Sequence, residues 1–171
     1  MHAAIIGIDP GARNSGVVLV RPHTPPQFHT VLNEGDILPP PADYLHDVIS
    51  AVYHLIDQGN VEHIALESLV RPNWHVGGGR AAKNPEALMG TAVVLGAVLA
   101  YRWPLPLHLV PPVANGGKPL AAYPAELISD GEKRRPGWQM RIGTGELRHV
   151  RSAYDVALNS KIIAKRAKAR A

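Results

Sequence analysis

The chain has 171 residues, of which 46% are hydrophobic, and its formal net charge is +4 at pH 7. This length suits one folded unit, and we expect residues 1–171 to form a single domain with its own hydrophobic core. The absence of cysteine excludes disulfide bonds, thiolate catalysis and zinc sites built on cysteine. The N-terminus lacks the layout of a signal peptide, and the longest apolar run, residues 87–101, is shorter than the roughly 20 residues of a membrane span. We therefore expect no membrane association and a cytoplasmic location, in the host cytoplasm if the source is a virus.

Three strands are expected at the start of the chain. The apolar run that ends on Asp9 and a Pro-Gly turn predicts a strand over 3–9. The β-branched run after the turn predicts a second strand over 15–21, which pairs with the first as a hairpin. A third strand is expected over 28–33. An aspartate at the end of a buried strand is costly unless a metal ion or a hydrogen-bond network uses its charge.

Two helices and one strand are expected in the middle of the chain. Apolar residues at helical spacing predict a helix over 43–57, and the next apolar run predicts a strand over 63–67. A Gly-rich basic loop over 71–83 leads to Asn84-Pro85-Glu86, which is typical of a helix start, and this helix runs to Trp103. It is apolar nearly all round, so we expect it to be buried on several sides. Its stripe of mostly small residues predicts a close neighbour, either the sheet or a second subunit.

The remaining segments complete the predicted order of elements. A fifth strand is expected over 105–110, and a last helix begins near Leu147 and continues into a basic tail. Between them, residues 112–146 are rich in proline and glycine, with one short helix expected around 119–128. Three early strands followed by alternating helices and strands predict an α/β fold with a mixed sheet.

Two acidic residues stand at the carboxyl ends of two predicted strands. If these strands are parallel neighbours, Asp9 and Glu67 lie about 5 Å apart, at the sheet edge where α/β proteins form their sites. Two carboxylates so close repel one another, and one of them holds a proton unless a cation lies between them. A hard divalent ion, Mg²⁺ or Mn²⁺, fits such oxygen ligands. The alternative for Asp9 is an ordinary turn aspartate.

A third acid lies in the last predicted helix. Asp155 stands among small and apolar residues, and Ser152 and Arg151 lie one turn back on the same helical face. The alternative for Asp155 is a salt bridge within the helix.

Three segments together resemble the RuvC family of Holliday-junction resolvases, which are RNase H-like nucleases. These segments are Ile6–Gly11 with the following Gly16, Ile64–Glu67 and Ser152–Ala157, and they match the family in order and spacing over nearly the whole chain. The resemblance implies an α/β, RNase H-like fold with a five-stranded mixed sheet flanked by helices, and a homodimer. It implies an endonuclease that resolves four-way DNA junctions by paired symmetric nicks in recombination and repair.

The resemblance also implies the catalytic site. Asp9, Glu67 and Asp155 match three of the family's four acidic metal-binding positions, with Asp9 bridging two Mg²⁺ ions, or Mn²⁺ as a substitute. Two metals about 4 Å apart activate the attacking water and stabilise the leaving oxygen. The fourth position, an acid or a histidine in the family, is Ser152 here, and a serine hydroxyl is a poor ligand. His149, one helical turn further back, either compensates for this change or caps the helix.

Positive charges gather in the last quarter of the chain, which suggests a polyanionic partner, with a solvated helix face as the alternative. The resemblance to the RuvC family implies that this partner is branched DNA, above all four-way junctions. The family places an aromatic wedge after the glutamate strand, for which Val70 and Trp74 are the candidates here. Lys118 and Arg151 are candidates for stabilising the phosphate. The expected DNA contacts are Arg71, Trp74, Arg80, Lys83, Lys118, Lys133, Arg134, Arg135 and Arg151.

Three other functions stay open. A related metal nuclease would act on flaps, forks or other branched DNA by independent nicks. A strand followed by Asp-x-Gly also opens the phosphate-binding loops of the actin and sugar-kinase fold, although that fold needs a longer chain. A DNA-binding module without nuclease activity is the third, because Ser152 stands where the family has a metal ligand.

Overall fold

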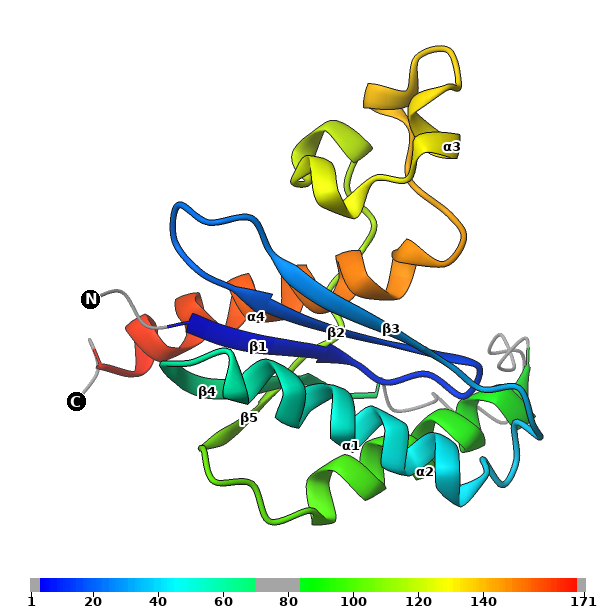
Figure 1. The fold of residues 1–171 in the computed structure, drawn as a ribbon, viewed down its shortest axis with the longest axis vertical. Coiled ribbons are helices and arrows are strands. Elements are labelled where there is room, and N and C mark those ends of the chain that lie inside the picture. The colour runs from blue at the N-terminus through cyan, green and yellow to red at the C-terminus, as the bar shows by residue number, and fades with distance from the viewer. Residues whose placement is uncertain (1–3, 70–83, 169–171) are drawn as a thin grey trace, which may run out of the picture.

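A five-stranded sheet forms the centre of the fold in the computed structural model, which describes residues 4–69 and 84–168, with side chains up to residue 161. The strands β1 (Ala4–Asp9), β2 (Asn14–Val20), β3 (Gln27–Leu32), β4 (Val61–Glu67) and β5 (Leu107–Val110) lie in the order β3-β2-β1-β4-β5 (Figure 1). β2 is antiparallel to β1 and β3, whereas β4 is parallel to β1 and β5 is parallel to β4. The predicted mixed sheet is confirmed, and its fifth strand begins at Leu107 rather than at residue 105.

Helices cover both faces of the sheet, as predicted. The helices α1 (Ala42–Asp57) and α2 (Pro85–Ala100) lie on one face, and α4 (Leu147–Lys168) lies on the other (Figure 1). Because side chains alternate along a strand, β1 contributes to both cores. Ile6 and Ile8 pack with Val48 and Val52 of α1, whereas Ile5 packs on the α4 side. Asp9 lies an even number of residues after Ile5, so its side chain is on the same face of the sheet and points toward α4.

Helix α2 differs from the prediction that it is buried on several sides. Only Gly90, Val94 and Val98 are buried, while Met89 is 57% exposed and Val93 is 38% exposed. The stripe of small residues meets this chain's own backbone, because a side chain at Gly90 would collide with the Ile37 carbonyl oxygen. The opposite face of α2 remains apolar and accessible. No helix in the described part of the chain combines the length and hydropathy of a membrane span.

The segment between β5 and α4 also differs from the prediction. In place of one helix around 119–128 it forms two 3₁₀ turns, η1 (Leu120–Ala122) and η2 (Ala125–Leu127). Pro124 separates them, because a proline has no amide hydrogen with which to continue the first turn. The short helix α3 (Asp130–Lys133), capped by Ser129, and the 3₁₀ turn η3 (Trp138–Met140) follow. This region projects beyond the sheet in Figure 1, where it is coloured yellow.

Candidate active site

The two strand-end acids meet at the edge of the sheet. β1 and β4 are parallel neighbours with Ile8 opposite Leu66, so Asp9 and Glu67 occupy the next positions on adjacent strands. Ile8 and Leu66 both pack in the core on the α1 side, and their successors therefore point toward α4. Asp9 is only 9% exposed and Glu67 is half-buried. The expectation that these strands are parallel neighbours is confirmed.

The pKa of Glu67 is raised by its surroundings. Burial, a hydrogen bond with Asp9 and the negative charge of Asp9 together raise the pKa of Glu67 from 4.5 to about 8. Burial and the charge of Asp9 thus favour the protonated form of Glu67, although the bonds from Asn115 and Ser152 act in the opposite direction. The Nδ2 of Asn115 donates to Glu67 Oε1 at 2.7 Å, and the Ser152 hydroxyl donates to Oε2 at 3.2 Å. Glu67 is thus held from three sides, by Asp9, Asn115 and Ser152.

Helix α4 places a histidine against Asp9. The Nδ1 atom of His149 lies 2.9 Å from Asp9 Oδ2. Glycines in the sheet permit this approach, because a side chain at Gly16, which pairs with Asp9, would collide with the His149 backbone. A side chain at Gly7 would collide with the Ala153 carbonyl oxygen in the same way. The helix therefore rests directly on β1 and β2, with His149 beside the first acid and Ser152 beside the second.

The turn after Asp9 is fixed by its own hydrogen bonds. The Ser15 hydroxyl accepts from the Gly11 amide at 3.2 Å and lies 2.7 Å from the Tyr44 hydroxyl. Tyr44 donates to the Gly11 carbonyl oxygen at 2.6 Å. Burial raises the pKa of Tyr44 to about 12, so its hydroxyl keeps the proton that it donates. The β1–β2 turn is therefore a rigid support for Asp9.

Asp155 does not join the acid pair, which corrects the expected cluster of three acids. Its carboxylate is 1% exposed and accepts hydrogen bonds from the Gly116 amide at 2.9 Å, Lys118 Nζ at 2.6 Å and the Tyr123 hydroxyl at 2.8 Å. Among the described residues, no three histidine, aspartate or glutamate side chains are grouped so that they could hold a metal. Since the glycine contacts set the position of α4, His149 and Ser152 face the acids, and Asp155 lies one turn further along the helix.

Arg151 is also placed differently from the expectation that it contacts DNA. Its side chain is fully buried and forms a bidentate pair with Glu132, with Nη1–Oε2 and Nη2–Oε1 distances of 3.1 and 3.0 Å. Nη1 also donates to the Leu127 carbonyl oxygen at 2.8 Å. This arginine fastens the segment before α4 to the helix, so it is inaccessible to a phosphate. It also forms no salt bridge with Asp155, whose cationic partner is Lys118.

The other residues expected to contact DNA fall into two groups. Lys133, Arg134 and Arg135 are exposed at the end of α3, and Lys118 is half exposed although it pairs with Asp155. The second group, Val70, Arg71, Trp74, Arg80 and Lys83, lies outside the described residues, as do the side chains of the basic tail beyond residue 161.

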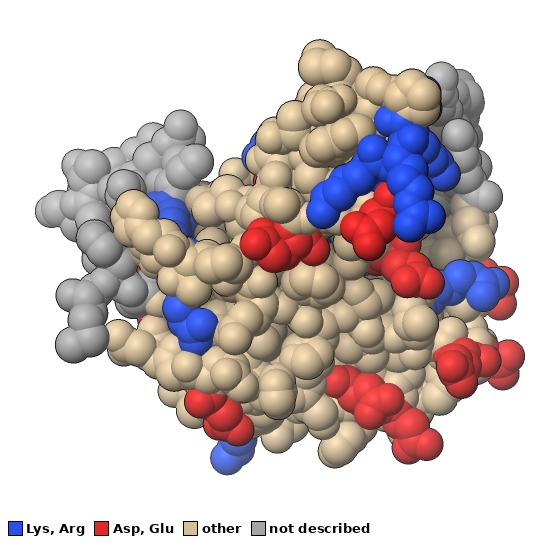
Figure 2. Space-filling view, turned by 45° about the horizontal axis from the view of Figure 1, so that its top comes forward, with Lys and Arg blue, Asp and Glu red and all other residues tan. Residues whose placement is uncertain are grey.

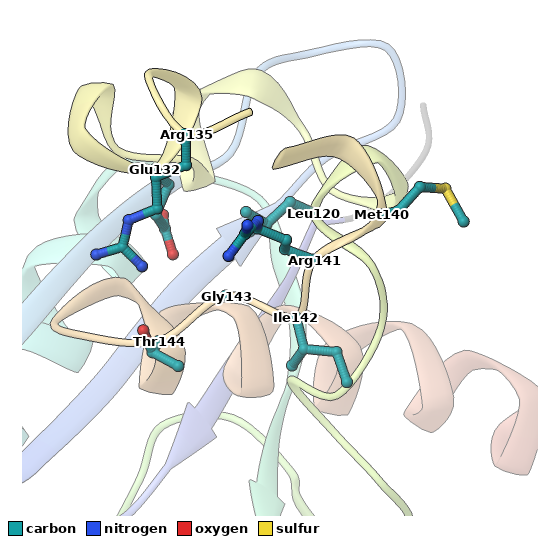
Figure 3. Close-up of a pocket in the computed structure, with 8 residues that line it drawn as sticks. All are labelled: Leu120, Glu132, Arg135, Met140, Arg141, Ile142, Gly143 and Thr144. Carbon is teal, nitrogen blue, oxygen red and sulfur yellow. The ribbon is translucent and has the colours of Figure 1, made fainter. Parts of the chain in front are cut away.

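A pocket of about 450 Å³ opens beside the exposed cations. Arg135, Arg141 and Glu132 line it together with the apolar side chains of Leu120 and Ile142 (Figure 3). Lysine and arginine side chains gather on one prominence of the surface, with acidic side chains below them (Figure 2). In the described part of the chain, no ion pair involves Lys133, Arg134, Arg135 or Arg141.

Asn115 is a site residue that the sequence reasoning missed. It follows β5, whose carboxyl end lies at the same sheet edge as those of β1 and β4. A polar residue shortly after a predicted parallel strand is a signal that would have identified it.

Comparison with known proteins identifies the fold. No protein-family model matches the chain, and no curated protein matches it. Among solved structures, the chain is similar to Thermus thermophilus RuvC in complex with a Holliday junction substrate, with 18% identity, 97% of each chain covered and a TM-score of 0.56. A second T. thermophilus RuvC structure matches with 18% identity, 96% of each chain covered and a TM-score of 0.55. The predicted RuvC-like, RNase H-like fold is therefore confirmed.

Proposed function

We propose that this protein is a divalent-cation-dependent endonuclease that cuts branched DNA, with the four-way junction as its substrate. The observation that carries the proposal is the Asp9–Glu67 pair on a RuvC fold. These acids lie at the carboxyl ends of adjacent parallel strands, where burial and mutual repulsion raise the pKa of Glu67. Such a pair favours a cation, because a divalent ion replaces the proton and relieves the repulsion between the two carboxylates.

The donor set fits a hard cation such as Mg²⁺, or Mn²⁺ in its place. Asp9 and Glu67 offer carboxylate oxygens, and Ser152 adds a hydroxyl oxygen beside Glu67. A bound divalent ion would polarise the scissile phosphate and lower the pKa of a bound water. We assign Asp9 and Glu67 as the catalytic ligands. Asp155 already accepts three hydrogen bonds, so the two-ion arrangement that the RuvC resemblance implies would require another ligand.

The surrounding side chains orient these two acids. His149 fixes Asp9 Oδ2 through its Nδ1 atom, and the Asn115 amide and the Ser152 hydroxyl each fix one oxygen of Glu67. Groups that orient metal ligands in this way contribute to affinity, typically about 10- to 100-fold. His149 therefore acts on the cation through Asp9, which is a positioning role.

The segment 120–146 provides the surface for the DNA backbone. Lys133, Arg134, Arg135 and Arg141 are exposed there, and two of them flank the pocket in Figure 3. Arginine pairs that face open space match phosphate oxygens in charge and geometry. We expect charge-removing substitutions at these positions to weaken junction binding and to flatten its salt dependence, without abolishing the chemistry.

A homodimer would place two such sites on one junction. Symmetric nicks require one site for each of two strands. The exposed apolar face of α2, which includes Met89 and Val93, supports an interface with a second copy. This face lies on the α1 side of the sheet, whereas the segment 120–146 packs against α4.

The direct test uses a labelled mobile four-way junction with Mg²⁺ and, separately, Mn²⁺. The Asp9→Asn variant should bind the junction as tightly as the unaltered protein, yet cleave it at least about 100-fold more slowly. Asp36→Asn, a change of the same kind at an exposed aspartate, serves as the matched control and should leave cleavage unchanged. Cleavage by Asp9→Asn at the control rate would contradict the proposal. Independent nicks on flaps and forks, rather than paired nicks on junctions, would favour the related branched-DNA nuclease.

A DNA-binding protein without nuclease activity is the second candidate. It is favoured by one observation, which is that only two carboxylates stand at the site, because Ser152 carries none and Asp155 is hydrogen-bonded to other partners. Junction binding with no cleavage by the unaltered protein in either metal would support this candidate.

A further inference from the structure

Asp155 is a buried carboxylate that the proposed cation site does not use. Its side chain is only 1% exposed, and it accepts three hydrogen bonds, from Gly116, Lys118 and Tyr123. A carboxylate has about four acceptor positions, so these bonds occupy most of its capacity. The charge of Asp155 is thus used within the protein rather than directed at Asp9 and Glu67.

All three donors come from one short segment that follows β5. Gly116 contributes its amide, Lys118 its ammonium and Tyr123 its hydroxyl. Gly116 has a φ of 71°, and a side chain there would contact Ser152, so the segment turns tightly against α4. The loop over 115–118 is therefore fastened to the helix through Asp155.

The same loop delivers a side chain to the acid pair. Asn115 donates to Glu67 Oε1 at 2.7 Å, while its own Oδ1 accepts from Asn159 of α4 at 2.9 Å. Asn159 lies one helical turn beyond Asp155, so two successive turns of α4 hold the loop, one at Asn115 and the other at Gly116 and Lys118. Asp155 is thus linked to Glu67 through two hydrogen bonds and the peptide bond between Asn115 and Gly116.

We propose that Asp155 is a positioning residue: it fastens the 115–118 loop to α4, so that Asn115 holds Glu67 in the orientation that binds the cation. This inference rests on the proposed function and names the role of one residue in that site. It differs from the role of a metal ligand, which the resemblance to the RuvC family implied for Asp155. The two roles predict different results, because removal of a ligand removes a binding site, whereas removal of a support weakens a site that persists.

Calorimetric titration of Mn²⁺ into the full-length protein, without DNA, separates the two roles. Asp155→Asn, Asn115→Ala and the double variant should all bind as many Mn²⁺ ions as the unaltered protein. Each single variant should weaken the affinity about tenfold, the size expected when one hydrogen bond to a metal ligand is lost. The double variant should also lose about tenfold rather than a hundredfold, because both substitutions interrupt the same chain of bonds.

Three outcomes would overturn the proposal. If Asp155→Asn binds fewer Mn²⁺ ions than the unaltered protein, Asp155 is a metal ligand. If its affinity for Mn²⁺ is unaltered, Asp155 has no role in the site. If the double variant loses about a hundredfold in affinity, Asp155 and Asn115 act independently. If Asp155→Asn does not fold, Lys118→Met takes its place, because it removes one donor at the exposed end of the network. The same tests then apply to it, with a smaller loss expected.

Hydrogen exchange without any metal gives a second measurement that is independent of cation binding. The amides of residues 115–118 should exchange faster in Asp155→Asn than in the control Asp36→Asn. Unaltered exchange would contradict the anchoring role, whatever the nuclease assays give. An unaltered protein that binds Mn²⁺ but cuts no branched DNA would contradict the proposed function alone.

Discussion

Glu67 and Asp9 make the stability of the protein depend on pH. Their proximity and burial raise the pKa of Glu67 to about 8, whereas an ordinary glutamate has a pKa near 4.5. Between these two values the folded chain keeps a proton on Glu67 that the unfolded chain has released. The free energy of unfolding therefore falls as pH rises through this window.

We expect Glu67→Gln to flatten this pH dependence, because the amide carries no charge in either state. Urea unfolding at intervals from pH 5 to pH 8, in a buffer free of divalent metals, measures the effect. The unaltered protein and the exposed control Glu34→Gln should both lose stability across this range more steeply than Glu67→Gln. Added Mg²⁺ should restore more stability at pH 8 than at pH 5, because the cation binds the deprotonated carboxylate. Parallel pH curves for all three proteins would contradict the assignment.

Arg151 has a structural role rather than a role in DNA binding. Its guanidinium is fully buried and paired with Glu132, whose pKa is held below the ordinary value, despite the opposing effect of burial, by bonds to Ser129 and Arg151. Removing one member of a buried pair leaves an uncompensated charge. Arg151→Met should therefore lower the free energy of unfolding by about 3–5 kcal/mol.

The double variant Arg151→Met with Glu132→Leu is the control for this change. It removes both charges and should recover most of the free energy of unfolding that Arg151→Met loses. A buried ion pair can often be replaced by apolar side chains. Thermal and urea unfolding both report the difference. A double variant as unstable as Arg151→Met would show that the lost packing, rather than the unpaired charge, dominates.

At the scale of elements, the strands and the proximity of Asp9 and Glu67 could be predicted from the sequence. The position of α4 on the sheet could not. Short apolar runs that end on Asp9 and Glu67 specify buried strands, and the polar ends of parallel strands share one edge. The contact face of α4 depends instead on Gly7 and Gly16, which admit the helix backbone at particular points of the sheet. Ser152 and Asp155 are one turn apart, so the sequence pattern did not determine which of them faces the acids. Pro124 likewise divided a predicted helix into two turns.

Gly16→Ala tests whether the sheet glycines set the position of α4. The added methyl group would collide with the His149 backbone, so we expect a loss of about 3 kcal/mol in stability. The displaced helix should also separate His149 from Asp9 and slow any junction cleavage. Gly131→Ala is the matched control, because its new methyl group in α3 would meet only Ser129 Oγ, at an ordinary contact distance of 4.0 Å, and should raise stability by at most about 1 kcal/mol. Equal unfolding curves for the two variants would contradict this account of the helix position.

At the scale of the whole molecule, the apolar and basic surfaces lie on opposite sides of the sheet. Val94 and Val98 fix α2 in the core on the α1 side, whereas Tyr123 and Leu127 join the core on the α4 side. A second copy bound at the exposed face of α2 would therefore leave the segment 120–146 accessible to DNA. The acids stand between these two surfaces, at the carboxyl ends of β1 and β4.

Val93→Glu tests the dimer through α2. Val93 and Met89 lie four residues apart on one helical face, and a charge placed between two copies of this face would be desolvated on association. We expect sedimentation to give a dimer for the unaltered protein and a monomer for Val93→Glu. Leu32→Glu is the control, because Leu32 is 49% exposed on β3, at the edge of the sheet formed by the strand most distant from β5. The monomeric variant should still nick a junction, but at one strand per binding event, because its single site no longer has a symmetric partner. A dimer that survives Val93→Glu and is lost in Leu32→Glu would move the interface to the sheet edge.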